Sequence, residues 1–344
     1  MPSVFRPTLP ADVDELGSFL RRILAPTGPG PGFESTHLTW KYWSPLGAGD
    51  GARSFVLTGD LGIEAHCGVL PTWLRSVHGR IRTAHFIDWA ADPRTMAAGV
   101  QLLRKVGRLT ESLCAVGGTP ATRKILPLMG FRPANQAVFF ARPVRPVRQA
   151  ATHQQRDWKL PLRLIRNALW ARFPTIKLPD GWTFELVTPD FVPTELWFPP
   201  TPSWAARERG PALYSHYLAC PFVRFELFLF RFREQPVGGC LLGFASGQAR
   251  VADLWLVKES ADWFEAAYQA ALAASLTDPT IAEVIACASI DPRLNALGQC
   301  GFREYRRESI LVLPADRAPR DGFDCQLLDN DTAFLTLGSP EYVT

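Results

Sequence analysis

The 344-residue sequence has no long apolar run, and no stretch approaches the roughly 18 residues that a membrane-spanning helix needs. Its first residues lack a basic region followed by an apolar core, so we expect no signal peptide and a cytoplasmic protein. The seven cysteines form no CxxC pair and the six histidines do not cluster with them, which argues against a zinc site. We therefore predict no bound metal.

The charge balance is also small, because 37 basic and 33 acidic residues leave a net charge of +4. That excess gives no reason to expect a specific nucleic-acid partner. The sequence is instead 47% hydrophobic and 20% charged, which is typical of folded globular proteins. Its length indicates about two domains.

Two parts of the chain resemble each other. Residues 119–132 and 290–303 both end in Gly-Phe-Arg, and Asp88 aligns with Asp253 at a similar offset. Further weak matches follow in the same order, which favours internal duplication over chance similarity. The predicted division of the chain is a first domain (1–144), a basic linker (145–177), a second domain (178–316) and a tail (317–344).

Each half shows the same order of elements, β-α-β-β-β-α-β-α-β, which predicts an α/β fold with mixed sheets. The elements predicted in the first half are strands at 4–8, 54–58, 63–73, 81–91, 113–116 and 135–141, and helices at 12–24, 95–109 and 121–129. Those predicted in the second half are strands at 184–187, 225–231, 237–244, 249–257, 281–287 and 306–313, and helices at 261–276 and 293–299. We expect two separate sheets that superpose.

The segment between the halves is strongly basic. Residues 142–177 contain nine Arg and Lys but one acid, Asp157. Apolar residues recur at helical spacing over 160–172, which predicts an amphipathic helix. Two interpretations stay open: a bridging helix that keeps its arginines in water, or a weak contact of residues 156–172 with an anion or a membrane surface.

Residues 88–99 read DWAADPRTMAAG and lead from a strand into a helix. This segment and the order of elements resemble the GNAT family of acyl-CoA-dependent N-acyltransferases, with one copy in each half. The family carries V-x-P and then (Q/R)-x-x-G-x-(G/A); here residues 91–93 and 94–99 stand in those places. The resemblance implies two tandem GNAT-like domains, the second of them degenerate, and acetyl-CoA or another acyl-CoA as cofactor.

The start of that helix suits a pyrophosphate on physical grounds, because its first N–H groups lack partners within the helix. Small residues allow close approach, and Arg94 adds positive charge. The predicted cofactor-binding residues are Trp89, Ala90, Ala91, Arg94, Thr95, Met96, Ala97, Ala98 and Gly99. The second copy has Glu259 and Asp262 at this place, so we predict one CoA per chain. An ordinary helix start without a ligand is the alternative.

The sequence departs from the family pattern at two positions. Ala97 replaces the first glycine of the loop, and Leu126 replaces the tyrosine that usually protonates the departing thiolate. These departures leave open a non-catalytic protein that binds acyl-CoA or serves as a scaffold. A third alternative is an aminoacyl-tRNA-dependent transferase of the peptidoglycan-bridge type, whose members also pair two such domains.

Three residues on the predicted strands are candidate catalytic groups: Asp88, His66 and Glu64. Asp88 lies among apolar neighbours, which predicts a raised pKa and a role as general base. Strand alternation predicts that Asp88 faces away from His85 and shares the face of Phe86. Glu64 is placed to orient His66. The alternatives are a structural hydrogen bond for Asp88 and an ordinary core position for His66.

Trp40, Lys41 and Tyr42 follow a Gly/Pro loop, at a place that covers the acceptor in GNAT proteins. Aromatic rings with one cation suit a flat polar substrate, although packing between the domains would also account for them. The predicted activity is therefore N-acetyltransfer, or transfer of another acyl group, to an amine of a small molecule or an amino sugar. We expect a monomer or a homodimer.

Overall fold

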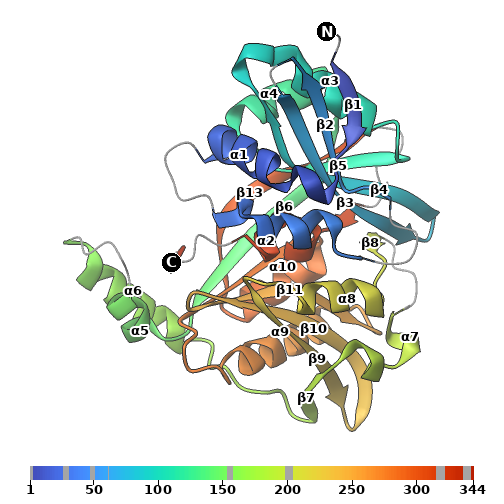
Figure 1. Cartoon of the computed structure of the whole chain (residues 1–344). Helices are drawn as coiled ribbons and strands as arrows, with labels where there is room; N and C mark the ends of the chain where they lie inside the picture. Colours follow the sequence, from blue (N-terminus) through green and yellow to red (C-terminus); the bar gives the residue numbers. More distant parts are fainter. Residues whose placement is uncertain are drawn as a thin grey trace.

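The fold is described from a computed structural model of the chain (Figure 1). The residues it describes are 3–25, 31–46, 51–60, 62–152, 158–197, 204–314, 322–335 and 342–344. Within them, no helix is both long enough and apolar enough to cross a bilayer.

One continuous mixed sheet of 14 strands forms the centre of the molecule. Its main path runs β1-β2-β3-β4-β5-β13-β6-β12-β11-β10-β9-β7, and the short strands β8 and β14 lie off this path. The first-half strands are β1 (Val4–Pro7), β2 (Ser54–Gly59), β3 (Gly62–Ser76), β4 (Gly79–Ala91), β5 (Ser112–Val116) and β6 (Arg132–Pro143). The others are β7 (Trp182–Val187), β8 (Ala205–Arg207), β9 (Arg224–Phe232), β10 (Gln235–Ala245), β11 (Gln248–Leu256), β12 (Glu283–Ala288), β13 (Arg303–Leu313) and β14 (Phe323–Asp324).

The predicted pair of separate sheets is wrong. The last strand of each half pairs with the penultimate strand of the other half: β13 with β5, and β6 with β12. Because β6 and β13 also pair with each other, the hydrogen bonding is continuous from one half to the other. Outward from this central pair the strand order is the same on both sides. The domain boundaries and the duplication stay predictions.

Helices cover both faces of this sheet. The helices of the first half are α1 (Val13–Leu24), α2 (Ser35–Leu38), α3 (Met96–Val106) and α4 (Pro120–Leu128), with a π-helical segment η3 (Thr39–Trp43). The remaining helices are α5 (Pro146–Thr152), α6 (Leu160–Arg172), α7 (Thr194–Trp197), α8 (Pro211–Leu218), α9 (Ala261–Ser275) and α10 (Asp291–Gln299). One core unites α1, α8 and the C-terminal segment 322–335 across both halves. On the opposite face, α3 and α4 share one core, and α9 and α10 share another.

All the predicted strands and helices are present, with ends within a few residues of the predictions. Helix α6 begins and ends where the apolar spacing places it. The short elements, among them α2, α8 and β8, have no counterpart among the predicted ones. Segment 322–335, which was predicted to be a tail, is folded against the body, and its Leu327, Leu328 and Phe334 are buried in the shared core.

Candidate active site

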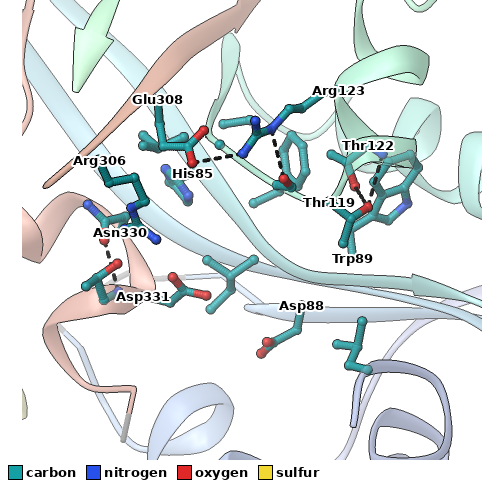
Figure 2. Close-up of a pocket in the computed structure, with 18 of the residues that line it drawn as sticks. His85, Asp88, Trp89, Thr119, Thr122, Arg123, Arg306, Glu308, Asn330 and Asp331 are labelled. Atoms are coloured by element: carbon teal, nitrogen blue, oxygen red, sulfur yellow. Dashed lines mark hydrogen bonds and ion pairs between the residues drawn. The ribbon is translucent and has the colours of Figure 1, made fainter. Parts of the chain in front are cut away.

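Strands β4 and β5 separate and leave a cavity between them. They pair in parallel at three positions, the last of which joins His85 to Cys114. Val116, at the end of β5, pairs instead with Ile310 of β13. A cavity of about 470 Å³ opens beside this divergence (Figure 2). Its polar and charged lining residues are His85, Asp88, Thr119, Thr122, Arg123, Arg306, Glu308, Asn330, Asp331 and Thr332.

A β-bulge at Asp88 shapes the floor of this cavity. In the register between β3 and β4, Gly68 faces Ile87 and His66 faces Ala90, so β4 carries one extra residue here. Asp88 takes a φ of 47°, a left-handed conformation that aspartate tolerates better than most residues. The extra residue reverses the alternation along the strand. Asp88 therefore lies on the α1 face together with Ile87.

The prediction that Asp88 and His85 face opposite sides is consequently wrong. His85 pairs across the strands with Leu70, which belongs to the core on the α1 face. Phe86, the predicted neighbour of Asp88, packs in the core on the α3 face. Both His85 and Asp88 line the same cavity. Burial lowers the pKa of His85 to about 3, so its ring is neutral at physiological pH.

Asp88 is held in a buried ion pair. Lys41 Nζ donates to its carboxylate at 2.7 Å, and the Tyr42 hydroxyl donates to the same oxygen. Burial disfavours the charged carboxylate, but the charge and hydrogen bonds of these partners outweigh it, and the pKa of Asp88 lies below its ordinary value. The predicted raised pKa is therefore wrong, and the paired carboxylate is poorly suited to accept a proton.

His66 and Glu64 do not form the predicted pair. The ring nitrogens of His66 contact Ser54 Oγ and the carbonyl oxygen of Asp88, each at 2.9 Å. Burial lowers the pKa of His66 to about 4, so its ring is neutral and braces the bulge. The Glu64 carboxylate accepts a hydrogen bond from Ser3 at 2.6 Å instead. A catalytic role for these two residues stays an untested prediction.

Of the predicted acceptor residues, Trp40 packs where the two halves meet. Its indole N–H donates to the His216 carbonyl at 2.9 Å, and its ring stacks on the His216 ring. Lys41 and Tyr42 hold Asp88, as described above. The residues that line the cavity do not include these three. The arrangement thus favours the packing alternative that the sequence left open.

The predicted cofactor loop runs from the end of β4 into α3. Trp89 lines the cavity, and its indole N–H donates to the Gly99 carbonyl at 3.0 Å. Arg94 bonds the Asp92 carboxylate at 2.9 and 2.7 Å, and Arg22 bonds the same carboxylate at 2.8 Å. The charge of Arg94 is therefore shared with an acid that the sequence analysis gave no role.

The side chains of the first turn of α3 point in different directions. Ala97 is exposed, whereas Ala98 and Gly99 are buried. Ala98 belongs to the core on the α3 face, together with Leu102. A charge placed at position 98 would therefore disturb the core, and Ala97 is the position at which to test an anion site. Ala90 is buried in the core on the α1 face, whereas Ala91 packs against the core on the α3 face. The Thr95 hydroxyl donates to the Asp92 carbonyl at 3.2 Å, and Met96 begins the helix.

Asp331, which was not among the predicted site residues, comes from segment 322–335. Two short 3₁₀ turns, η7 (Leu327–Asp329) and η8 (Asp331–Ala333), carry it to the wall of the cavity. Figure 2 shows Asp331 and Asp88 on the same side of that cavity. Among the described residues, no ion pair involves the Asp331 carboxylate. Burial and the negative charge of Asp88 raise the pKa of Asp331 to about 6.

Buried contacts fix this segment in place. Arg207 Nε bonds Asp329 at 2.6 Å, and Phe334 packs in the shared core. The Asn330 side chain caps η8 by accepting from the Thr332 N–H. On the other wall of the cavity, Glu308 is paired with Arg123 at 2.8 Å. Asp331 is therefore held in a fixed position at the cavity wall. Its carboxylate has no ion-pair partner among the described residues.

The corresponding place in the second half is filled. Strands β11 and β12 pair over four positions, from Gln248 to Val251 on β11. Beyond them, the Gln326 side chain bonds both the N–H and the carbonyl of Leu254, at 2.8 and 3.1 Å. Arg293 bonds Asp324 at 2.9 Å, and both side chains are buried. The C-terminal segment thus occupies the position that is a cavity in the first half.

Asp253, the counterpart of Asp88, also lies at a register shift. Its carboxylate accepts from Arg209 at 2.8 and 2.9 Å, from Tyr214 at 2.5 Å and from Gln326 at 2.8 Å. A basic residue and a tyrosine therefore hold the aspartate in both halves. The difference is that Gln326 bonds both Asp253 and the Leu254 backbone, so its side chain occupies the space beside Asp253.

Comparisons with known proteins identify the fold. No protein-family model and no curated protein sequence matches the chain. A GCN5-related N-acetyltransferase from Anabaena variabilis ATCC 29413 superposes with a TM-score of 0.58 at 12% identity, over 90% of this chain and 72% of that one. A conserved protein of unknown function from Enterococcus faecalis V583, a probable N-acyltransferase, superposes at 0.57 with 8% identity, over 91% and 72%. A GCN5-related N-acetyltransferase from Kribbella flavida gives 0.51 at 9%, over 90% and 71%.

Proposed function

We propose that this chain, whose fold is that of the GCN5-related N-acetyltransferases, is an acyl-CoA-dependent N-acyltransferase. The observation that carries the proposal is the cavity between β4 and β5, which holds Asp331, a carboxylate that no described residue engages in an ion pair, beside a bulged strand. The donor substrate enters between the separated strands, and the amine acceptor approaches Asp331. A cavity of about 470 Å³ suits a small-molecule amine or an amino sugar.

The separated strands suit an extended donor for a simple reason. Where β4 no longer pairs with β5, its backbone groups can bond the amides of a pantetheine arm, as an added strand would. In the second half those backbone groups at Leu254 are bonded by Gln326. The first half therefore offers the one strand separation, among the described residues, that remains open to a ligand. Arg22 and Arg94 both bond Asp92, and together the three side chains leave one net positive charge near the expected pyrophosphate.

The residues of the cavity can carry out the transfer as follows. Acyl-CoA supplies the thioester carbon, to which the amine nitrogen bonds as the carbon–sulfur bond breaks and the sulfur leaves as a thiolate, which then takes up the proton that the amine has released. Asp331, ionised at neutral pH, accepts the proton that the amine gives up. A backbone N–H at the β4 bulge, near Trp89, polarises the thioester carbonyl. Asp88, Lys41 and His66 keep the bulge in its conformation.

We expect one CoA to bind per chain, because segment 322–335 fills the second site. Isothermal titration with CoA should give a stoichiometry near one. Two equivalent sites would contradict the assignment. If CoA does not bind at all, the scaffold alternative is favoured, and salt-sensitive binding of tRNA would favour the aminoacyl-tRNA alternative.

Ala97→Glu is expected to weaken CoA binding by at least tenfold. The substitution places a carboxylate at the exposed start of α3, where like charge opposes a pyrophosphate. The matched control is Ala261→Glu, at the exposed start of α9 in the second half, which should leave CoA affinity unchanged. Equal affinities for the two variants would show that the pyrophosphate lies elsewhere.

A further inference from the structure

Helices α5 and α6 stand out from the body of the molecule as a hairpin (Figure 1). Large apolar side chains along α6 and at its two ends are exposed to solvent. They are Trp158 (78% exposed), Leu162 (60%), Ile165 (59%), Leu169 (60%) and Phe173 (73%). The proposed acyltransfer uses none of these five residues, which we call the α6 stripe.

The α6 stripe occupies one side of the helix. Leu162, Ile165 and Leu169 are three and four residues apart, so they share a face. The opposite side faces the protein: Trp170 donates to the Gly301 carbonyl at 2.6 Å, and Asn167 donates to Gln149 at 2.8 Å. Because these contacts fix the rotation of the helix, the apolar side points away from the protein.

The charge around the stripe is positive. Helix α6 carries Arg163, Arg166 and Arg172, and its sequence contains no acidic residue. Arg166 and Arg172 are exposed beside the stripe. A second copy of this helix would bring the same positive charges against it, which opposes self-association through this face. A partner surface should therefore be both apolar and negatively charged.

We propose that α6 docks on an anionic lipid membrane, lying in the plane of its surface. The α6 stripe enters the boundary between headgroups and acyl chains, and the arginines contact the anionic headgroups. The aromatic residues Trp158 and Phe173 mark the two ends of the stripe, a position that suits the bilayer interface. The helix lies on the membrane and does not cross it, since it has 13 residues.

The test uses the full chain and lipid vesicles. The protein is expected to co-sediment with vesicles of phosphatidylcholine and 30% phosphatidylglycerol, and at least tenfold less with phosphatidylcholine alone. Raising the salt concentration should weaken binding, because part of the attraction is electrostatic. The triple variant Leu162→Ser/Ile165→Ser/Leu169→Ser and the double variant Arg166→Gln/Arg172→Gln should each lose at least tenfold in vesicle affinity.

Leu128→Ser/Phe191→Ser is the matched control, because it removes two exposed apolar residues elsewhere (86% and 76% exposed). It should bind vesicles as the parent protein does, and circular dichroism should show that all variants are folded. The proposal is overturned if anionic vesicles do not bind the parent protein, or if they bind the stripe variant equally well. It is also overturned if the parent is a dimer that the stripe variant dissociates, because the stripe is then an interface between copies.

Discussion

Replacing Asp331 with asparagine is expected to lower kcat for amine acylation by about 10²–10⁴-fold, the usual contribution of a general base. The amide keeps the shape of the side chain but cannot accept the proton of the amine. CoA affinity should not change, because the proposed CoA contacts lie on β4 and at the start of α3, whereas Asp331 belongs to segment 322–335. Steady-state kinetics with an acyl-CoA and an amine acceptor, combined with CoA titration, measure both quantities.

The pH dependence gives an independent check. The base acts when it is ionised, so kcat of the parent should rise with pH and level off above about 6, the pKa of Asp331. Asp331→Asn should lose this step. Glu308→Gln, the same chemical change on the opposite wall, should reduce kcat by less than tenfold, since Glu308 is already paired with Arg123. If the two variants show equal loss, Asp331 is not the base.

The stability of Asp331→Asn shows whether its loss of activity comes from the missing base or from misfolding. The pKa of Asp331 is raised in the folded protein, so ionisation opposes folding, and its cost grows as the pH rises from about 4 to about 6. Above that range Asp331→Asn should be at least as stable as the parent. A less stable variant would indicate that the carboxylate serves the fold.

Lys41→Met is expected to lower the free energy of unfolding by about 3–5 kcal/mol, because it leaves the Asp88 carboxylate buried without its cation. The Lys41 and Asp88 side chains are 1% and 6% exposed, so water cannot replace the missing partner. Chemical denaturation monitored by tryptophan fluorescence measures the loss. Lys124→Met, at an exposed position on α4, should change stability by less than about 0.5 kcal/mol.

The double variant Lys41→Met/Asp88→Asn tests the reason for that loss. Asparagine tolerates the left-handed backbone at position 88 and removes the unpaired charge. It should therefore recover a large part of the lost stability. If the double variant is as unstable as Lys41→Met, the loss comes from packing around Lys41, whose ammonium also lies 5.4 Å from the Phe334 ring.

Local patterns in the sequence predict most of this fold. The apolar spacing in 160–172 gives α6 with its observed ends, and alternation with turn residues gives the long strands β3 and β4. The exchange of β6 and β13 has no such signal, because which strand pairs with which depends on distant parts of the chain. The alternation of apolar residues in β6 and β13 is compatible with an antiparallel neighbour from either half.

The site is harder to predict for the same reason. The predicted alternation of side chains between the two faces of β4 fails at Asp88. A bulge inserts one residue there, and sequence periodicity does not reveal it. Asp331 lies in a segment without helical or strand spacing. It reaches the cavity because Leu327 and Phe334, on either side of it, are buried in a core whose other residues are far away in sequence. The sequence does show polar residues followed by Ala333 and Phe334. That signal identifies a capped turn but not where the turn lies.

Segment 322–335 contacts both halves of the molecule. Gln326 fills the space beside Leu254 of β11, and Asp331, five residues later, lines the cavity between β4 and β5. An insertion or deletion between them would leave the contact of Gln326 with Leu254 intact but would move the Asp331 carboxylate away from the cavity. The number of residues between Gln326 and Asp331 is therefore constrained by both halves. The contacts of Gln326 in the second half determine where Asp331 lies in the cavity of the first half.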